Sequence, residues 1–341
     1  MSSNSLVFSH QRETVIALSK SFKSIDVLTS ETCTRPLPAN IRVTEIPWVK
    51  GSNFLNFFNI ILVALPVLIK NRDSILFNYM TDAHAAILSP LAWLLRRRHV
   101  LWYAHANNSA YLTFSSFFVS KIVSSTPGSC NLRINRKKVV FINQGIKQTD
   151  FPFESRRFKG FNRLFYYGRF DRSKNIHLFK DLVIELNQKK ITYNFEAFGK
   201  PVSLDSESYV RSLRTSSNSH RELKFQEPIP RKYIPEVSKN FDVFVNLFTG
   251  SLDKTLIEVT LMGLPVVTWN QEFCNEFGTW SGAKPVNSLV FIRDEIYFLN
   301  SMDEDEIQTE IWRRYQLAVK NHTFDGWIFR LLFVLKDGAG V

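Results

Sequence analysis

Basic side chains gather in the segment from Tyr167 to Asn175, at Arg169, Arg172 and Lys174. The segment follows an apolar run that is typical of a strand and precedes an amphipathic run that is typical of a helix. The cations would therefore lie near a helix N-terminus, where backbone N–H groups and the helix dipole already favour an anion. Guanidinium and ammonium groups at such a place can hold a diphosphate. The alternative is a charged loop that only faces solvent.

A polar turn between two apolar runs opens the segment TGSLDKTLIEVTLMGLPVVT, residues 249–268. The turn and the start of the helix that follows contain Gly250, Ser251, Asp253, Lys254 and Thr255. An anion would be favoured at this helix start as well. Glu258 lies one helical turn after Lys254 on the same face. It can either serve a ligand or form a surface ion pair with Lys254, which would contribute roughly 0.3 kcal/mol.

Polar side chains also follow two apolar runs in the first half of the chain. His105 ends the run WYAH, and Asp82 and His84 follow the apolar run at 74–80. Ligands of open α/β sheets bind at the carboxyl ends of strands, so each of these residues would face a site. His105 can act as a general acid or base, donate a hydrogen bond to a sugar, or simply be a histidine with satisfied hydrogen bonds.

Several motifs of other enzyme classes are absent from the sequence. There is no Walker-type glycine-rich loop, no His/Cys metal spacing, no Gly-x-Ser-x-Gly elbow and no Asp-x-Asp metal–diphosphate motif. The basic residues are not interleaved with aromatic residues as in nucleic-acid-binding modules. The cysteines, Cys33, Cys130 and Cys274, are far apart and odd in number, which predicts a reducing compartment. Neither a metal nor nucleic acid is expected as a partner.

Short apolar runs alternate with longer helical runs along the chain, and these elements must position the polar residues. Strands are predicted at 24–30, 41–48, 74–80, 99–105, 121–126, 138–145, 163–169, 193–200, 222–229, 241–248 and 264–269. Helices are predicted at 54–69, 83–98, 110–120, 175–190 and 231–240, before 219, after the turn at 250, and through the C-terminal part. Such alternation predicts βαβ units and parallel sheets.

The segment 151–162 interrupts this alternation, because it is charged, aromatic and contains proline. We therefore expect an α/β protein with two Rossmann-like domains. The first covers residues 1–150, the linker 151–162 follows, and the second covers 163–320. A C-terminal helix at 321–341 is expected to pack back toward the first domain.

The positive charge is concentrated in the first half of the chain. The net charge is +12, and residues 1–150 contain 17 Lys and Arg against 7 Asp and Glu. Residues 54–69 form a 16-residue apolar run, shorter than the ~20 residues of a membrane span, so it predicts a buried helix or an interfacial one. With the cluster Arg96–Arg98, this half would suit an anionic lipid surface. No secretory signal is expected, so the protein is expected in the cytoplasm, either free or peripheral on the inner face of the cytoplasmic membrane.

Taken together, several segments resemble glycosyltransferases of family 4 with the GT-B fold. FYYGRFDRSKNI, IPEVSKNFDVFVNLF and TGSLDKTLIEVTLMGLPVVT resemble the family's donor domain in order and spacing. VVFINQGIKQTDF resembles its interdomain segment, and HVLWYAH with KIVSSTP resembles a bacterial and archaeal subgroup. The resemblance implies two Rossmann-like domains that face a central cleft. It also implies a metal-independent enzyme that moves a sugar, with retention, from a nucleoside diphosphate to a glycan or lipid-linked acceptor in polysaccharide or glycolipid synthesis.

The resemblance also implies roles for individual residues. Arg169 and Lys174 would hold the diphosphate and stabilise it as it departs, Glu258 would bind the ribose, and His105 would contact the transferred sugar. The catalytic set is then His105, Arg169 and Lys174. The donor-binding set is Gly168, Arg169, Lys174, Gly250, Ser251, Asp253, Lys254, Thr255 and Glu258. The acceptor-side set is His10, Asp82 and Gly145, with Gly145 on the hinge side of the cleft.

The sequence departs from the family pattern at two places. Gly250 stands where the family has its first acid, eight residues before Glu258, and the first strand is reduced to a short run at 6–8. One alternative is therefore a GT-B protein that transfers no sugar, such as a sugar-nucleotide epimerase or a degenerate nucleotide-sugar-binding subunit. A basic nucleic-acid-binding protein, with strongly salt-dependent affinity, is a further alternative.

Overall fold

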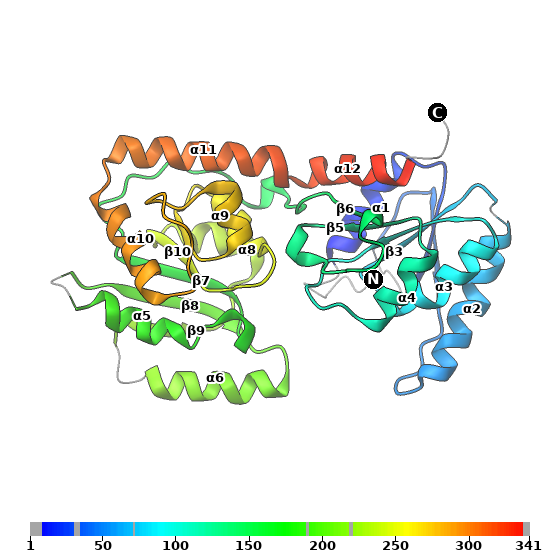
Figure 1. Ribbon diagram of the computed structural model, residues 1–341, viewed down its shortest axis with the longest axis horizontal. Coiled ribbons are helices and arrows are strands. Elements are labelled where there is room, and N and C mark those ends of the chain that lie inside the picture. The colour runs from blue at the N-terminus through cyan, green and yellow to red at the C-terminus, as the bar shows by residue number, and fades with distance from the viewer. Residues whose placement is uncertain (1–8, 31–34, 71, 189–190, 218–220, 337–341) are drawn as a thin grey trace. The chain divides into compact units, whose positions relative to one another are not determined.

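The computed structural model describes residues 9–30, 35–70, 72–188, 191–217 and 221–336 (Figure 1). The chain divides into two compact units, each of the α/β class. Unit 1 contains the residues up to Asn143 together with those from Asp325 onward, and unit 2 contains Gln144–Phe324. The predicted strand at 6–8 and Cys33 lie outside the described residues.

Unit 1 contains two parallel sheets. The strands β1 (Ile25–Thr29) and β2 (Ile41–Glu45) pair with each other, and the second sheet has the order β3 (Ile75–Tyr79), β4 (Arg98–Trp102), β5 (Lys121–Ser124) and β6 (Val139–Phe141). Its helices are α1 (Ser9–Ser19), α2 (Asn53–Lys70), α3 (Asp82–Leu94), α4 (Ala110–Phe118) and α12 (Phe324–Lys336). Helix α3 packs against both α2 and α4.

The C-terminal helix α12 belongs to unit 1. Trp327 of this helix packs edge-on against Trp102 of β4, with 5.0 Å between the ring centroids. Arg98 donates a hydrogen bond of 2.7 Å to the carbonyl of Val334, and Arg330 donates one of 2.9 Å to the carbonyl of Ile142. These contacts bring the last helix of the chain onto the sheet that the first half forms.

Unit 2 is built on one parallel sheet of order β11-β10-β7-β8-β9. Its strands are β7 (Arg163–Arg169), β8 (Asn194–Lys200), β9 (Leu223–Gln226), β10 (Val243–Asn246) and β11 (Val266–Thr268). Its helices are α5 (Leu178–Leu186), α6 (Leu204–Ser217), α7 (Ile234–Ser238), α8 (Lys254–Leu261), α9 (Gln271–Phe277), α10 (Leu289–Ser301) and α11 (Glu304–His322). Helix α8 packs with α11 and α5 packs with α10, which leaves the central strands covered (Figure 1).

Burial on both faces explains why the strands of unit 2 read as continuous apolar runs. All four residues of β10 are buried, and the rings of Phe165 and Phe241 stack at 4.7 Å with 9° between their planes. Aromatic side chains thus fill much of this core. A fully buried phenylalanine contributes about 2–3 kcal/mol relative to an exposed one.

The predicted strands are all present among the described residues from 25 onward, although most are shorter than predicted. One helix limit was wrong: the predicted helix at 83–98 ends at Leu94, and Arg98 already belongs to β4. The backbone of Arg96 is left-handed at φ +54°, and the N–H of Arg97 reaches back to the carbonyl of Ala92. This closure ends the helix before the basic cluster. The strand after it ends at Trp102, so His105 follows three residues later.

Candidate functional site

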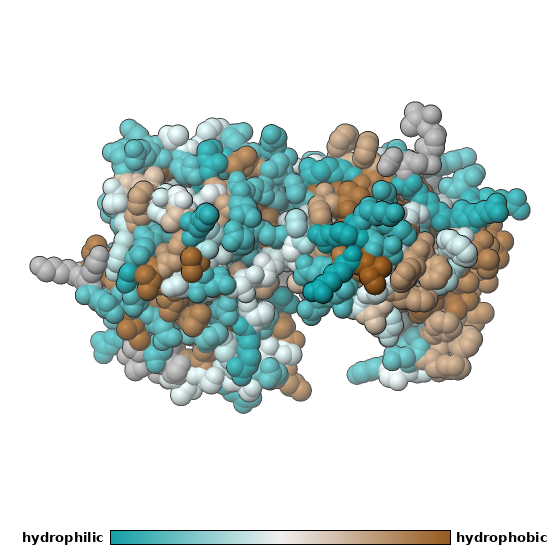
Figure 2. Space-filling model, in the orientation of Figure 1, coloured by the Kyte–Doolittle hydropathy of each residue, from teal (hydrophilic) through white to brown (hydrophobic). Residues whose placement is uncertain are grey.

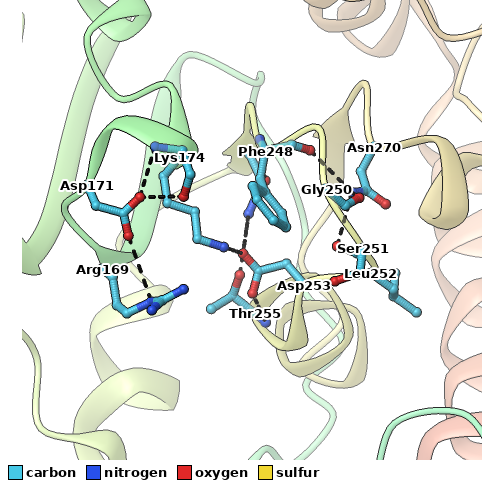
Figure 3. Close-up of polar contacts among 12 residues, drawn as sticks. Arg169, Asp171, Lys174, Phe248, Gly250, Ser251, Leu252, Asp253, Thr255 and Asn270 are labelled. Atoms are coloured by element: carbon cyan, nitrogen blue, oxygen red, sulfur yellow. Dashed lines mark hydrogen bonds and ion pairs between the residues drawn. The ribbon is translucent and has the colours of Figure 1, made fainter. Parts of the chain in front are cut away.

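Two segments that are far apart in sequence meet at the carboxyl ends of β7 and β10 (Figure 3). One is the 3₁₀ turn Arg172–Lys174 that follows β7, and the other is the polar turn that follows β10. The Nζ atom of Lys174 lies 2.5 Å from Oδ2 of Asp253. Parallel pairing of β7 with β10 places both strand ends at one edge of the sheet, which is why this contact forms.

Lys174 is buried rather than presented to solvent. Its side chain is 7% exposed, and its ammonium lies 3.6 Å from the centroid of the Phe248 ring. Asp253 caps helix α8 by accepting from the N–H of Thr255, and it also accepts from the side chain of Asn246. Although burial alone would raise the pKa of Asp253, the charge and hydrogen bond of Lys174 hold that pKa below its usual value.

Arg169 differs from Lys174 in its exposure. Its side chain is 64% exposed, and its Nε lies 4.0 Å from Oδ2 of Asp171. Asp171 is engaged with the backbone, because it accepts from the N–H of Ser173 at the start of the 3₁₀ turn. Of the two cations predicted to hold a diphosphate, Arg169 therefore faces solvent, whereas Lys174 is buried in an ion pair.

The polar turn is held in place by side chains that the sequence analysis missed. The side-chain amide of Asn270 donates to the carbonyls of Phe248 and Gly250, at 3.2 and 2.9 Å. Glu272 accepts from the N–H of Leu252 at 2.5 Å. Gln144 donates to the carbonyl of the same leucine at 2.9 Å. The sequence contained one sign of their role. Asn270 and Glu272 are polar residues that follow the predicted strand at 264–269, where helix α9 begins.

Gly250 lies under an aromatic ring. A β-carbon built on Gly250 would stand 2.2 Å from Cζ of Phe248, so any side chain at this position requires the ring to move. The same ring is the one that the Lys174 ammonium contacts. The family pattern has an acid at position 250, but here the Phe248 ring fills the space that its side chain would need. The same ring links position 250 to the buried ammonium of Lys174.

The variant Gly250→Ala should therefore lower the free energy of unfolding by about 1–2 kcal/mol, as over-packing does in a filled region. The double variant Gly250→Ala with Phe248→Ala should lose less than the sum of the two single changes, because the smaller side chain leaves room for the new methyl group. Urea unfolding measures both, with Ser251→Ala as the control in the same turn. Full additivity would contradict the proposed clash.

Glu258 is not a surface acid paired with Lys254. Its side chain is 4% exposed, and both carboxylate oxygens are bound within the protein. Oε1 accepts from Nη1 of Arg231 at 2.7 Å, and Oε2 accepts from the hydroxyl of Tyr167 at 2.8 Å. Burial, and then the charge of Glu258, raise the pKa of Tyr167 well above its usual value, so this phenol stays protonated and donates.

Two further cations lie around this carboxylate. Arg231 has a side chain that is 44% exposed, and it also approaches Asp150 at 3.6 Å. Lys254 is exposed at the start of α8. The pKa of Lys254 is lowered, first by the protein atoms that crowd it and also by the charge of Arg231, against an opposing effect of Glu258. An anionic ligand placed here would stabilise the charged form of this lysine.

A shallow, mainly apolar groove lies beside Arg231, at the carboxyl ends of β8 and β9. Its volume is about 450 Å³, and its lining contains apolar side chains together with two acids, Glu227 and Glu236. A larger hollow of about 670 Å³ lies elsewhere in unit 2, along Thr279–Gly282 and the ends of α10 and α11. Its lining contains none of the predicted site residues. The groove, by contrast, begins at Pro230, next to Arg231 in the chain. Its apolar residues offer a surface for a flat ring, whereas Glu227 and Glu236 disfavour an anionic group inside it.

The remaining predicted residues belong to unit 1 or to the first residues of unit 2. Asp82 begins α3 and accepts from the hydroxyl of Ser109, and His105 is exposed with its ring 5.5 Å from that of Tyr103. His10 lies in α1, and its side chain is outside the description. Gly145 is buried in unit 2, directly after the chain leaves unit 1.

Across the described ranges, no group of three or more His, Cys, Asp and Glu side chains is arranged to hold a metal ion. Cys130 and Cys274 are buried thiols. Burial raises the pKa of Cys274 to about 12, which keeps it protonated and unreactive.

No family model matches the sequence, and no curated protein is significantly similar to it. Solved structures do match. The chain is similar to Anabaena HepE, solved in complex with UDP, at 12% identity and a TM-score of 0.72 over 97% of each chain. It is similar to a glycosyltransferase from Rickettsia africae at 13% identity and a TM-score of 0.72, covering 98% of this chain and 96% of the other.

Sucrose-phosphate synthase from Thermosynechococcus elongatus matches equally well, at 13% identity and a TM-score of 0.72, over 97% of this chain and 93% of the other. At identities this low the structural match establishes the fold alone, so function must be argued from the site. The predicted fold class, α/β of the GT-B type, is confirmed.

Proposed function

We propose that this protein is a glycosyltransferase that uses a nucleoside diphosphate sugar bound at the carboxyl edge of the unit 2 sheet. The observation that carries the proposal is the juxtaposition of exposed Arg169 with the buried Lys174–Asp253 pair, between the ends of β7 and β10. It occurs in a chain that shares its fold, over nearly its whole length, with HepE, which was solved in complex with UDP, and with a solved glycosyltransferase from Rickettsia africae.

Charge stabilisation is the chemistry that these residues can perform. When the bond from the sugar carbon to the phosphate oxygen breaks, the bonding electrons leave with the diphosphate. Fixed cations and helix N–H groups around that oxygen lower the barrier, because they need no rearrangement as the charge develops. Arg169 would meet the diphosphate directly. Lys174, held by Asp253 and the Phe248 ring, would supply a preorganised charge behind it.

The other predicted residues complete the proposal. Ser251, Thr255 and the amides near Gly250 and Gly168 would contact the donor, and Lys254 would add a cation. Glu258, with Arg231 and Tyr167, would shape the ribose end, and the groove beside Arg231 would receive the base. His105 as a contact to the transferred sugar, His10, Asp82 and Gly145 as acceptor-side residues, retention, and the absence of a metal are all proposals that rest on the family resemblance.

The acceptor is proposed to be a glycan or a lipid-linked sugar in polysaccharide or glycolipid synthesis, used at the cytoplasmic face of a membrane. A second candidate is a GT-B protein that binds a nucleotide sugar without transferring it. The observation in its favour is Phe248, which fills the position where the family pattern has an acid. Both candidates require donor binding, so only turnover separates them.

We expect one member of a panel of UDP-, GDP-, ADP- and dTDP-sugars to raise the melting temperature, because a ligand that binds the folded state stabilises it by mass action. Arg169→Ala should weaken that binding by at least ~10-fold, equal to about 1.4 kcal/mol. Arg211→Ala, an exposed arginine on α6, is the matched control and should change nothing.

Hydrolysis of the donor, or its transfer to a lipid extract, would then be measured on the donor that binds. Binding without any turnover would favour the second candidate. If no nucleotide sugar binds, or if both arginine variants behave alike, the proposed donor site is wrong.

A further inference from the structure

The outer face of helix α2 is apolar along almost its whole length. The inner stripe Asn56, Ile60, Ala64 and Leu68 is buried, and Ile60 and Ala64 lie in one cluster with Leu88 of α3. Large apolar side chains on the remaining faces are exposed, namely Phe54, Leu55, Phe57, Phe58, Leu62 and Ile69. A helix that only covered a core would place polar residues on these faces.

The asparagines of α2 do not supply that polar face. Asn56 is buried and binds both the N–H and the carbonyl of Val49, at 2.8 and 2.9 Å. Asn59 donates to the carbonyl of Pro47 at 2.8 Å. Both side chains therefore fasten the preceding loop to the helix. The outward face is left to phenylalanine, leucine, isoleucine and Pro66.

The apolar surface continues onto the neighbouring helices. At the end of α3, Trp93 is 62% and Leu94 is 71% exposed, and on α4, Phe117 is 57% exposed. The Trp93 ring packs edge-on against that of Phe118, with 6.0 Å between centroids. Figure 2 shows apolar residues gathered over α2 and α3. We call the set Phe54, Phe58, Leu62, Trp93, Leu94 and Phe117 the α2–α4 surface.

Basic residues stand at one end of this surface. Lys70 ends α2, and Arg72 and Arg96 are exposed close by. Their proximity follows from Arg97, which donates to the carbonyls of Leu68 (3.0 Å) and Arg72 and so fixes the turn after α3 against the end of α2. Asp73 follows in the same loop, and the group keeps a net positive charge.

Lipid is the partner whose chemistry matches both features. Contiguous apolar patches of this kind mark interaction sites, and cations at their border favour anionic headgroups. Helix α2 is long and apolar enough to cross a membrane by length and composition, with 18 residues and a mean hydropathy of 1.7. Its buried stripe, however, fastens it along α3. A helix held in this way can lie in the interface without spanning it.

We propose that the α2–α4 surface docks unit 1 on an anionic membrane, with the outer face of α2 in the interfacial layer and Lys70, Arg72 and Arg96 against lipid phosphates. This surface would make the membrane contact that the basic first half of the chain predicts, and the contact does not depend on sugar transfer. Vesicle sedimentation tests it without a sugar donor, so its failure and that of the proposed activity are separate results.

The full chain would be sedimented with vesicles of phosphatidylcholine alone or with added phosphatidylglycerol, at low salt and at ~0.15 M salt. We expect at least ~10-fold stronger partitioning onto the anionic vesicles. The double variant Phe54→Ser with Leu62→Ser should reduce binding to both vesicle types by at least ~10-fold. The double variant Lys70→Glu with Arg96→Glu should reduce binding to anionic vesicles to the neutral-vesicle level.

Matched controls come from exposed residues elsewhere. Val202→Ser with Leu204→Ser removes two exposed apolar side chains from unit 2, and Lys20→Glu with Lys23→Glu makes the same charge change after α1. Both should bind vesicles as the wild type does. The proposal is overturned if the wild type does not sediment with anionic vesicles at low salt, or if the controls lose as much binding as the test variants. It is also overturned if Phe54→Ser with Leu62→Ser leaves vesicle binding unchanged and converts a dimer to a monomer by light scattering, since a second copy would then cover the surface.

Discussion

Replacing Lys174 with alanine is expected to lower the free energy of unfolding by roughly 3 kcal/mol, the usual cost of removing one partner of a buried ion pair. Asp253 would remain, with a side chain only 14% exposed and its main cation gone. Turnover of the donor should fall by at least ~10²-fold, since a preorganised charge at the leaving group is lost. Urea unfolding and donor turnover measure the two effects.

The double variant Lys174→Ala with Asp253→Asn separates these effects. It leaves no uncompensated charge, so most of the lost stability should return, while donor turnover should remain low. If turnover returned together with stability, Lys174 would be a structural residue only. If the single variant cost less than about 1 kcal/mol, the pair would not be buried as described.

The Lys174–Asp253 pair should also make the stability of the wild-type protein depend on pH. The folded-state pKa of Asp253 is below its usual value, so its contribution to stability is complete above the unfolded-state value of about 3.9. It is lost as the pH falls through the lower, folded-state value. Removing the carboxylate with Asp253→Asn should flatten this acid limb.

Replacing Arg231 with alanine is expected to lower the free energy of unfolding by roughly 3 kcal/mol. Glu258 would stay buried and keep the hydrogen bond from the Tyr167 hydroxyl, but it would lose its ion pair with Arg231. Urea unfolding at neutral pH measures this loss.

A rescue variant and a control variant test the Arg231 prediction. Adding Glu258→Gln to Arg231→Ala removes the buried charge, and it should restore most of the lost stability. Arg214→Ala disrupts an exposed pair with Glu227 and should change stability by less than about 0.5 kcal/mol. If Arg231→Ala changed the free energy of unfolding as little as Arg214→Ala, Glu258 would not need the arginine to remain buried.

Local pattern was sufficient for the strands from residue 25 onward and for their order, whereas helix α1 (Ser9–Ser19) was not predicted. Continuous apolar runs predicted β7 and β10, because strands covered on both faces contain few polar residues. The same alternation predicted parallel sheets, and with them the edge where ligands bind. Arg169, Lys174 and the turn at Gly250 could be assigned to that edge, because each lies at the end of a predicted strand or shortly after it.

The contact partners of these side chains and their burial could not be predicted from local sequence. Lys174 and Asp253 are 79 residues apart, and Arg231 and Glu258 are 27 apart, so no local spacing relates them. Helical spacing allowed an exposed pair between Lys254 and Glu258 as an alternative to a ligand role. The helix instead turns this glutamate into the protein, where Arg231 and Tyr167 bind it. Asn270 and Glu272 likewise bind a turn that precedes them by about 20 residues.

The sequence by itself therefore determined the α/β class, the parallel sheets and the chemistry available at their carboxyl edge, since these depend on local hydrophobic periodicity and on which residues follow each strand. Only the tertiary structure decided that Arg169 faces solvent while Lys174 is buried, that Phe248 fills the space over Gly250, and that α2 leaves its apolar face outward. The physical reason is that exposure and pairing depend on which strands and helices become neighbours, and that choice is made by packing across the whole chain.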